Sequence, residues 1–324
     1  MAGQSEASEA RVKALTDQLE TGISRIFQSS QYAEYLSAMS KFHHYSFSNS
    51  MLIFMQRPDA TCVAGYNDWK NKFGRQVKAE EKGIHILAPS QYSRWVRQEK
   101  RDPETDQPVY GADGQPVMEW VKVRGVKFHV VTVFDISQTV GKKLPALGVA
   151  ELSGNVAEYE RMVGALKALS PLPVVFEAFP GKAKGYCSHV ENRIVVQPGM
   201  SQTQTVKTLV HEVAHAKLHP PPDILNTERP DRSTREVEAE SVAYVVCQHF
   251  GIDTSDYSFA YVASWSRDKG VDVLRASMDR IHAAATELIS CMEGPEKEQV
   301  RLAPRRQKQA GRPSKRKRQA APSR

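Results

Sequence analysis

The segment HEVAHAKLH, residues 211–219, constrains the fold more than any other part of the sequence. Positions i and i+4 share one face of an α-helix, so His211 and His215 can direct their imidazoles at one metal ion. Apolar residues recur around them at helical spacing, which predicts a helix packed on one side. A catalytic zinc site takes three protein ligands, so the chain must fold to bring one more donor to this helix.

The next predicted helix, STREVEAESVAYVVCQHFG, offers that donor. Glu236 and Glu240 lie four residues apart on an otherwise apolar face, where charged groups are costly to bury unless they are paired or bind metal. We assign Glu236 as the third ligand and Glu240 as the acceptor of a hydrogen bond from a ligand imidazole. Helix geometry alone leaves the reverse assignment open. Glu238 falls on another face, and His219 is interpreted as a helix C-terminal histidine that does not bind the metal.

Glu212, directly after the first histidine, can lie beside the ion without binding it. There it would act as the general base that takes a proton from an attacking water. The pattern therefore predicts a Zn²⁺-dependent hydrolase with catalytic Glu212 and the ligands His211, His215 and Glu236. The alternative is that the histidines are surface or hydrogen-bonded core residues, which would be preferred for an isolated pair.

The charge distribution indicates a polyanionic partner. Residues 296–324 carry 11 Lys+Arg and 2 Asp+Glu, a net charge of +9, whereas the whole 324-residue chain carries +7. Residues 41–97 carry 9 basic and 4 acidic residues, a net charge of +5. Apolar runs are too short for a membrane span, and the first thirty residues lack a signal-peptide core, so we expect a cytoplasmic protein without a membrane partner.

The order of helical and strand patterns predicts an α+β fold with two domains. We expect a small α+β domain over 8–137, a linker over 138–153, a second α+β domain over 154–293 and a disordered basic tail over 294–324. Within the first domain, residues 101–116 have the composition of a solvated loop at the tip of a long hairpin. In the second, helices are expected at about 202–219, 233–249, 255–266 and 271–290.

Aromatic and basic residues alternate between residues 41 and 95, as in proteins that stack unpaired bases and bind phosphates. They are Tyr45, Phe47, Tyr66, Trp69, Phe73, Tyr92 and Trp95, with Lys41, Arg57, Lys70, Lys72, Arg75, Lys78, Lys82 and Arg94. The alternative is that most of these rings are core and the cations form a solvated face. Composition alone favours that alternative.

These motifs carry a family resemblance. HEVAHAKLH with REVEAESVAYVV resembles the zincin domains of the ImmA/IrrE and ArdC type, in which two histidines and a downstream glutamate bind the metal. The segments YSFSNSMLI, QRPDATCVAGYNDW, FGRQVKAEEKGIHILAP and VFDISQT resemble the single-stranded DNA-binding N-terminal domain of ArdC-type antirestriction proteins. One departure is Glu80, where that family usually has glycine, which puts the local turn in question.

The resemblance implies a single-stranded DNA-binding protein with a zincin-like metallopeptidase domain. It further implies a role in DNA transfer by a mobile element, protecting entering DNA from restriction. Arg57, Trp69, Arg75 and Lys78 are then our expected DNA contacts. Two other functions stay open: a DNA-binding protein with an idle zinc domain, and a regulatory protease that cleaves a repressor or a protein bound at DNA.

Overall fold

The computed structural model describes residues 2–27, 31–144, 156–221, 230–257 and 259–293. The predicted basic tail over 294–324 and most of the predicted linker over 138–153 lie outside these ranges. Residues 139–141, at the start of that linker, form a strand, β5 (Thr139–Gly141). In the described part of the chain, no helix is long and apolar enough to cross a membrane.

The N-terminal half is built from helices and a small antiparallel sheet. Its helices are α1 (Ala2–Phe27), α2 (Gln31–Lys41), α3 (Phe47–Gln56) and α4 (Tyr66–Asn71), and η1 (Ile136–Gln138) is a 3₁₀ turn. Its strands, with β5, are β1 (Val63–Gly65), β2 (Arg75–Val77), β3 (Ile84–Glu99) and β4 (Met118–Asp135). The sheet order is β1-β4-β3, and β2 pairs with β5 alone. The side chain of Ser46 caps α3 by accepting from the backbone N–H of Asn49, which fixes where this buried helix begins.

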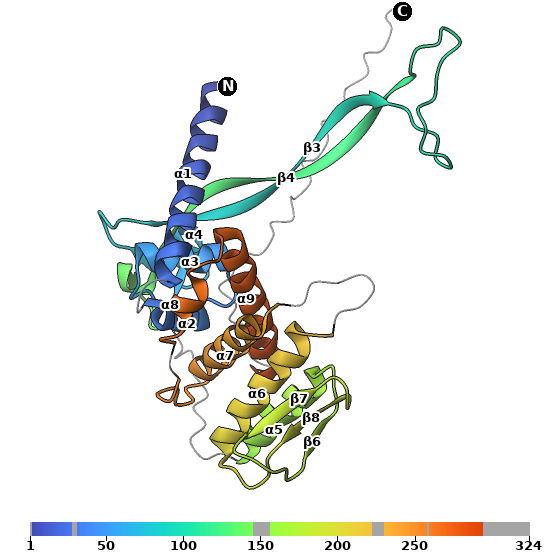
Figure 1. Cartoon of the computed structure of the whole chain (residues 1–324). Coiled ribbons are helices and arrows are strands. Elements are labelled where there is room, and N and C mark those ends of the chain that lie inside the picture. The colour runs from blue at the N-terminus through green and yellow to red at the C-terminus, as the bar shows by residue number, and fades with distance from the viewer. Residues whose placement is uncertain (1, 28–30, 145–155, 222–229, 258, 294–324) are drawn as a thin grey trace, which may run out of the picture.

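Strands β3 and β4 continue past this sheet as a long two-stranded ribbon that projects away from the helices (Figure 1). At its base, Ile84 and Ile86 are buried against the helices, whereas Trp95 and Trp120 further out are exposed. Residues 101–116 lie at the far end of the ribbon, as the loop composition predicted. The outer ribbon therefore has little core of its own and offers both faces to solvent.

The C-terminal half places helices against a small mixed sheet of order β6-β8-β7. Its strands are β6 (Val174–Phe176), β7 (Gly185–Ser188) and β8 (Arg193–Val196). Its helices are α5 (Val156–Leu169), α6 (Gln202–Leu218), α7 (Arg232–His249), α8 (Val262–Ser266) and α9 (Val271–Glu293). The helix expected over 255–266 is shorter than predicted, because Asp253 and Thr254 form turns with Ser255 and Tyr257 before α8 begins.

The two halves share one hydrophobic core. Helix α2 packs against α7, where the Tyr32 hydroxyl lies 2.7 Å from Ser241 Oγ in a buried hydrogen bond. Phe27 at the end of α1 packs against Trp265 of α8, with ring centroids 5.6 Å apart. Helices and sheets alternate as an α+β fold, which confirms the predicted class.

Candidate metal centre and nucleic-acid interface

Helix α6 carries both histidines of the motif on one face. Its N-terminus is fixed by Ser201, whose side chain accepts from the backbone N–H of Gln204, and its apolar face is buried. His211 and His215 turn their Nε2 atoms toward each other at 3.1 Å. Burial lowers the pKa of His211 to about 4, so this imidazole is neutral near pH 7 and free to donate a lone pair.

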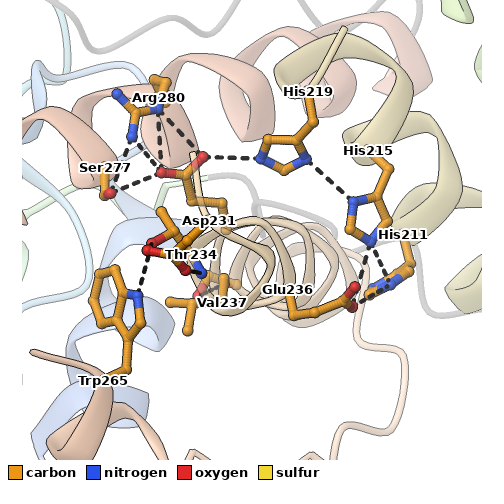
Figure 2. Close-up of polar contacts among 12 residues, drawn as sticks. His211, His215, His219, Asp231, Thr234, Glu236, Val237, Trp265, Ser277 and Arg280 are labelled. Atoms are coloured by element: carbon orange, nitrogen blue, oxygen red, sulfur yellow. Dashed lines mark hydrogen bonds and ion pairs between the residues drawn. The ribbon is translucent and has the colours of Figure 1, made fainter. Parts of the chain in front are cut away.

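Helix α7 crosses α6 and brings Glu236 to the Nε2 atoms of the two histidines. Glu236 Oε2 lies 3.5 Å from His215 Nε2 and 3.8 Å from His211 Nε2 (Figure 2). Donors held at zinc distances in a tetrahedron are roughly 3.3 Å apart. The three donors thus form a triangle of suitable size for Zn²⁺, and the described residues fit the metal that the motif implies.

Glu212, the next residue after His211, lies where α6 packs against β7. Its carboxyl is 7% exposed, and burial raises its pKa to about 7, with the charge of Glu236 adding to that rise and a hydrogen bond from the backbone N–H of Cys187 opposing it. Gly185 of β7 allows this close approach, since a Cβ there would lie 3.2 Å from Glu212 Cγ and 2.7 Å from a Thr208 methyl. A carboxyl that titrates near neutral pH can both accept and return a proton.

A relay of buried polar groups fixes the orientation of His215 (Figure 2). His219 Nε2 lies 3.0 Å from Glu238 Oε2, and His219 Nδ1 lies 3.1 Å from His215 Nδ1. Glu238 is fully buried, and although burial alone would raise its pKa, hydrogen bonds from His219, Arg280 and Ser277 bring it below its usual value. The Glu238 carboxylate therefore accepts a hydrogen bond from the Nε2–H of His219.

The same relay sets the tautomer of the ligand histidine. Burial keeps the pKa of His219 below its usual value, so the neutral ring uses Nδ1 as an acceptor. His215 must then donate from Nδ1, which leaves the lone pair of its Nε2 directed at Glu236 and His211. This is how metal-binding histidines are held in proteins. Reasoning from the sequence did not predict that His219 and Glu238 pair behind His215, because this contact depends on the packing of α6 against α7.

Glu240 does not occupy the predicted position behind a ligand histidine. Its carboxylate accepts a hydrogen bond from the Tyr261 hydroxyl, and burial raises its pKa. The physical reason is the helical turn: Glu240 follows Glu236 by one turn toward α8, whereas the buried face toward His219 carries Glu238. Glu236, and not Glu240, is the carboxylate that meets the two histidines among the described residues.

Two of the expected DNA contacts have structural roles. Trp69 is completely buried and its indole N–H donates to the carbonyl of Phe134, so its ring cannot stack on a base and this prediction is wrong. The half-buried Arg75 guanidinium donates to Thr139 and to the carbonyl of Lys142, which ties β2 to the segment around β5, and its contact with DNA stays a prediction. Both structural roles arise because short strands far apart in the sequence meet here.

Arg57 and Lys78 lie together at the turn that follows β4. The Arg57 side chain donates to the Ser137 hydroxyl at 3.2 Å, and Lys78 Nζ donates to the Ser137 carbonyl at 2.8 Å. Lys78 is exposed and Arg57 half-buried. The two cations form a small basic site that a phosphate can reach, beside the root of the ribbon.

A larger basic and aromatic surface lies on the ribbon itself. Trp95 and Trp120 are 63% and 65% exposed, which is unusual for such large apolar side chains. In the β3–β4 register Trp95 faces Lys122 and Arg97 faces Trp120, so rings and cations alternate across the two strands. Cross-strand partners lie on the same face, and Arg124, two residues from Lys122, extends this face toward the base. We call Trp95, Arg97, Trp120, Lys122 and Arg124 the ribbon face.

Comparison with known proteins finds two family matches along the chain. Residues 5–131 match the model of the N-terminal domain of anti-restriction factor ArdC. Residues 171–257 match the IrrE N-terminal-like domain, a peptidase family. Together they cover both candidate sites.

Two curated relatives are similar over much of the chain. An uncharacterized protein of Bacillus anthracis is 26% identical over 322 residues, covering 89% of this chain and 52% of the relative. DNA primase TraC of Escherichia coli is 29% identical over 223 residues, covering 64% of this chain and 15% of the primase. The chain thus spans about half the length of the first and a small part of the second.

Crystal structures of the antirestriction ArdC protein from plasmid R388 also align with this chain. The metal-free structure is 23% identical with a TM-score of 0.40, and the Mn(II)-bound structure is 19% identical with a TM-score of 0.41. Each alignment covers 77% of this chain and 83% of the R388 chain.

The fold and its two sites define a class of protein in which an ArdC N-terminal domain precedes a domain of metallopeptidase type. In this order of domains the chain is similar to the ArdC-type proteins.

Proposed function

We propose that the protein binds single-stranded DNA and hydrolyses peptide bonds at a zinc site formed by His211, His215 and Glu236. The convergence of these three donors next to the buried carboxyl of Glu212 carries the proposal. When bound, a zinc ion would supply Lewis-acid polarisation of a peptide carbonyl. Two imidazoles and a carboxylate suit zinc, with one coordination position left open.

The residues of the chain supply the rest of the chemistry. Glu212 takes a proton from the attacking water as the water oxygen bonds to the carbonyl carbon. It then returns that proton to the leaving amine as the C–N bond breaks, so one peptide and one water become an acid and an amine. Burial of Glu212 raises its pKa and so favours its holding the proton between the two steps.

The substrate that fits this geometry is an extended polypeptide. Strand β7 lies at the edge of its sheet and packs against α6 next to Glu212. A strand at the edge of a sheet can pair with an extended peptide through main-chain hydrogen bonds. We propose that such a peptide belongs to a protein bound at DNA, because the DNA-binding half would bring the peptidase to it.

Glu212→Gln tests the enzymatic part. The amide cannot take a proton from water, so we expect cleavage of casein or of a peptide library to fall by at least ~100-fold. Zinc content, measured by mass spectrometry, should stay at the wild-type level, since Glu212 is not a donor. Glu287→Gln, an exposed change on α9, is the matched control. Cleavage that persists in Glu212→Gln would refute the mechanism.

The DNA-binding part rests on the ribbon face and the Arg57–Lys78 site. Stacking of a base on an aromatic ring contributes ~1–3 kcal/mol, and cations beside the rings can bind the phosphates. Trp95→Ala with Trp120→Ala should weaken binding of an oligo-dT by at least ~30-fold, whereas the double change to Phe should keep most of it. Val126→Ala on the same ribbon is the control. Equal affinity in all variants would mean that DNA binds at another surface of the protein.

The matched family is named for an anti-restriction factor. We propose that this chain likewise serves DNA transfer by a mobile element, as an accessory that protects entering DNA. The rival function is DNA binding beside an idle zinc domain. If Glu212→Gln leaves protection of transferred DNA unchanged, binding alone explains the phenotype.

A further inference from the structure

A second cluster of histidines and a carboxylate lies far from the zinc site. His43 and His44 follow α2, His249 is the last residue of α7, and Glu293 is the last residue of α9. His249 is thirteen residues beyond Glu236 on the same helix, which separates the two sites by about 20 Å. Donor atoms of His43, His44 and Glu293 lie within 4.8 Å of one another.

Two of these histidines are oriented by a single carbonyl. The Ser40 carbonyl lies 3.1 Å from His43 Nδ1 and 3.0 Å from His249 Nδ1. A carbonyl can only accept, so both rings carry a proton on Nδ1. His249 also donates from Nε2 to the Glu293 carboxylate, 3.0 Å away, whereas His43 directs the lone pair of its Nε2 away from Ser40. Metal-binding histidines are commonly held this way, by a hydrogen bond from the other ring nitrogen to a backbone carbonyl.

The Nε2 atom of His43 has no hydrogen-bond partner among the described residues, although the side chain is only 4% exposed. Buried polar atoms are rarely left without a partner. The ion pair between His249 Nε2 and Glu293 Oε1, 3.0 Å apart, does not involve His43 and leaves the Nε2 atom of His43 unsatisfied.

The electrostatic surroundings favour a cation at this point. Helices α2, α7 and α9 all end here, and the C-terminal end of each helix carries a partial negative charge. Glu293 adds a carboxylate whose pKa lies below its usual value, because hydrogen bonding and the charge of His249 outweigh the effect of burial. One divalent ion would satisfy the carboxylate and the unpartnered Nε2 of His43 together.

We propose that His43, His44 and Glu293 form a second site for a divalent transition metal of the zinc type. Two imidazoles and one carboxylate are donors that suit zinc. Bound donors span roughly 4 Å, so binding would draw the present group slightly together. The ion would join the end of α2 in the N-terminal half to α9 and, through the hydrogen bond between Glu293 and His249, to α7.

The experiment counts metal ions in the tag-free full chain. The protein is stripped with EDTA, dialysed against Zn²⁺, desalted and measured by mass spectrometry. We expect two zinc equivalents in the wild type, one in His43→Ala and one in Glu293→Gln. Glu236→Ala should also keep one, and Glu236→Ala with Glu293→Gln none. His129→Ala on the ribbon is the matched control and should keep two.

The outcomes separate the two sites. One equivalent in the wild type and none in Glu236→Ala would overturn the second site. One equivalent in the wild type that His43→Ala or Glu293→Gln removes would support it while refuting the peptidase site. Because His43→Ala removes a buried side chain, the decision rests on Glu293→Gln if the alanine variant does not fold. Zinc should then raise the Tm of Glu236→Ala, but not that of Glu236→Ala with Glu293→Gln.

Discussion

At the scale of single residues, Glu238 determines how well His215 can bind metal. Glu238→Gln removes the charge that holds the proton on His219 Nε2, and it leaves Arg280 without its buried partner. Loss of such a supporting carboxylate weakens metal affinity by ~10–100-fold, and breaking a buried ion pair costs ~3–5 kcal/mol. Competition with a chelator and chemical denaturation measure the two effects.

Glu240→Gln is the matched control, because Glu240 contacts Tyr261 and not the relay. It should change zinc affinity by less than ~3-fold, within the range of an ordinary surface substitution of about 0.5 kcal/mol. If both variants lose affinity equally, the relay has no particular part in metal binding.

Glu80 shows how one residue can depart from a family pattern and still preserve the turn. Its φ is +61°, in the left-handed region that glycine adopts without strain. The turn before β3 is therefore formed, at a cost of ~1–2 kcal/mol for a residue with a side chain. Glu80→Gly relieves this strain but adds freedom to the unfolded chain, so we expect a net stabilisation of up to ~1 kcal/mol. Urea denaturation measures the free energy of unfolding. The control is Glu81→Gly, which should destabilise the protein because Glu80 beside it keeps the strained turn.

At the scale of elements, the helices with one buried face could be predicted closely. The helices expected at 202–219, 233–249 and 271–290 correspond to α6, α7 and α9, because burial on one side imposes a helical repeat on the sequence. The full length of the ribbon could not be predicted. Its outer strands are exposed on both faces, so the alternation that marks a half-buried strand is absent.

The residues of the candidate site also fall into those that could be predicted from one helix and those that depend on tertiary packing. His211, Glu212 and His215 could be recognised because their relation is local to one helix. The choice between Glu236 and Glu240 depends on how α7 crosses α6, and the burial of Trp69 depends on its position under β4. The aromatic residues expected to bind DNA accordingly fall into a buried group and an exposed group. Tyr45, Phe47 and Trp69 are core, whereas Tyr66, Tyr92 and Trp95 are exposed.

At the scale of the whole molecule, the N-terminal half and the C-terminal half are joined by a common core. Buried residues of α1, α2 and α3 belong to the same hydrophobic cluster as those of α6, α7 and α9. The Thr286 hydroxyl of α9 donates to the carbonyl of His43, which adds a polar tie between the halves. A ligand that orders the N-terminal helices would therefore also stabilise α7, the helix that carries Glu236.

This arrangement predicts that the helices of both halves unfold together. Tyr32→Ala removes a fully buried ring of α2 and its hydrogen bond to Ser241, at a cost of ~3–5 kcal/mol. Because the core is shared, the free energy of opening measured by hydrogen exchange should fall by a similar amount in α2 and in α9. Val126→Ala on the exposed ribbon should change neither by more than ~0.5 kcal/mol. Protection that falls in α2 while α9 keeps its wild-type value would mean that the halves unfold independently, and binding at the ribbon could then not stabilise the zinc site through this core.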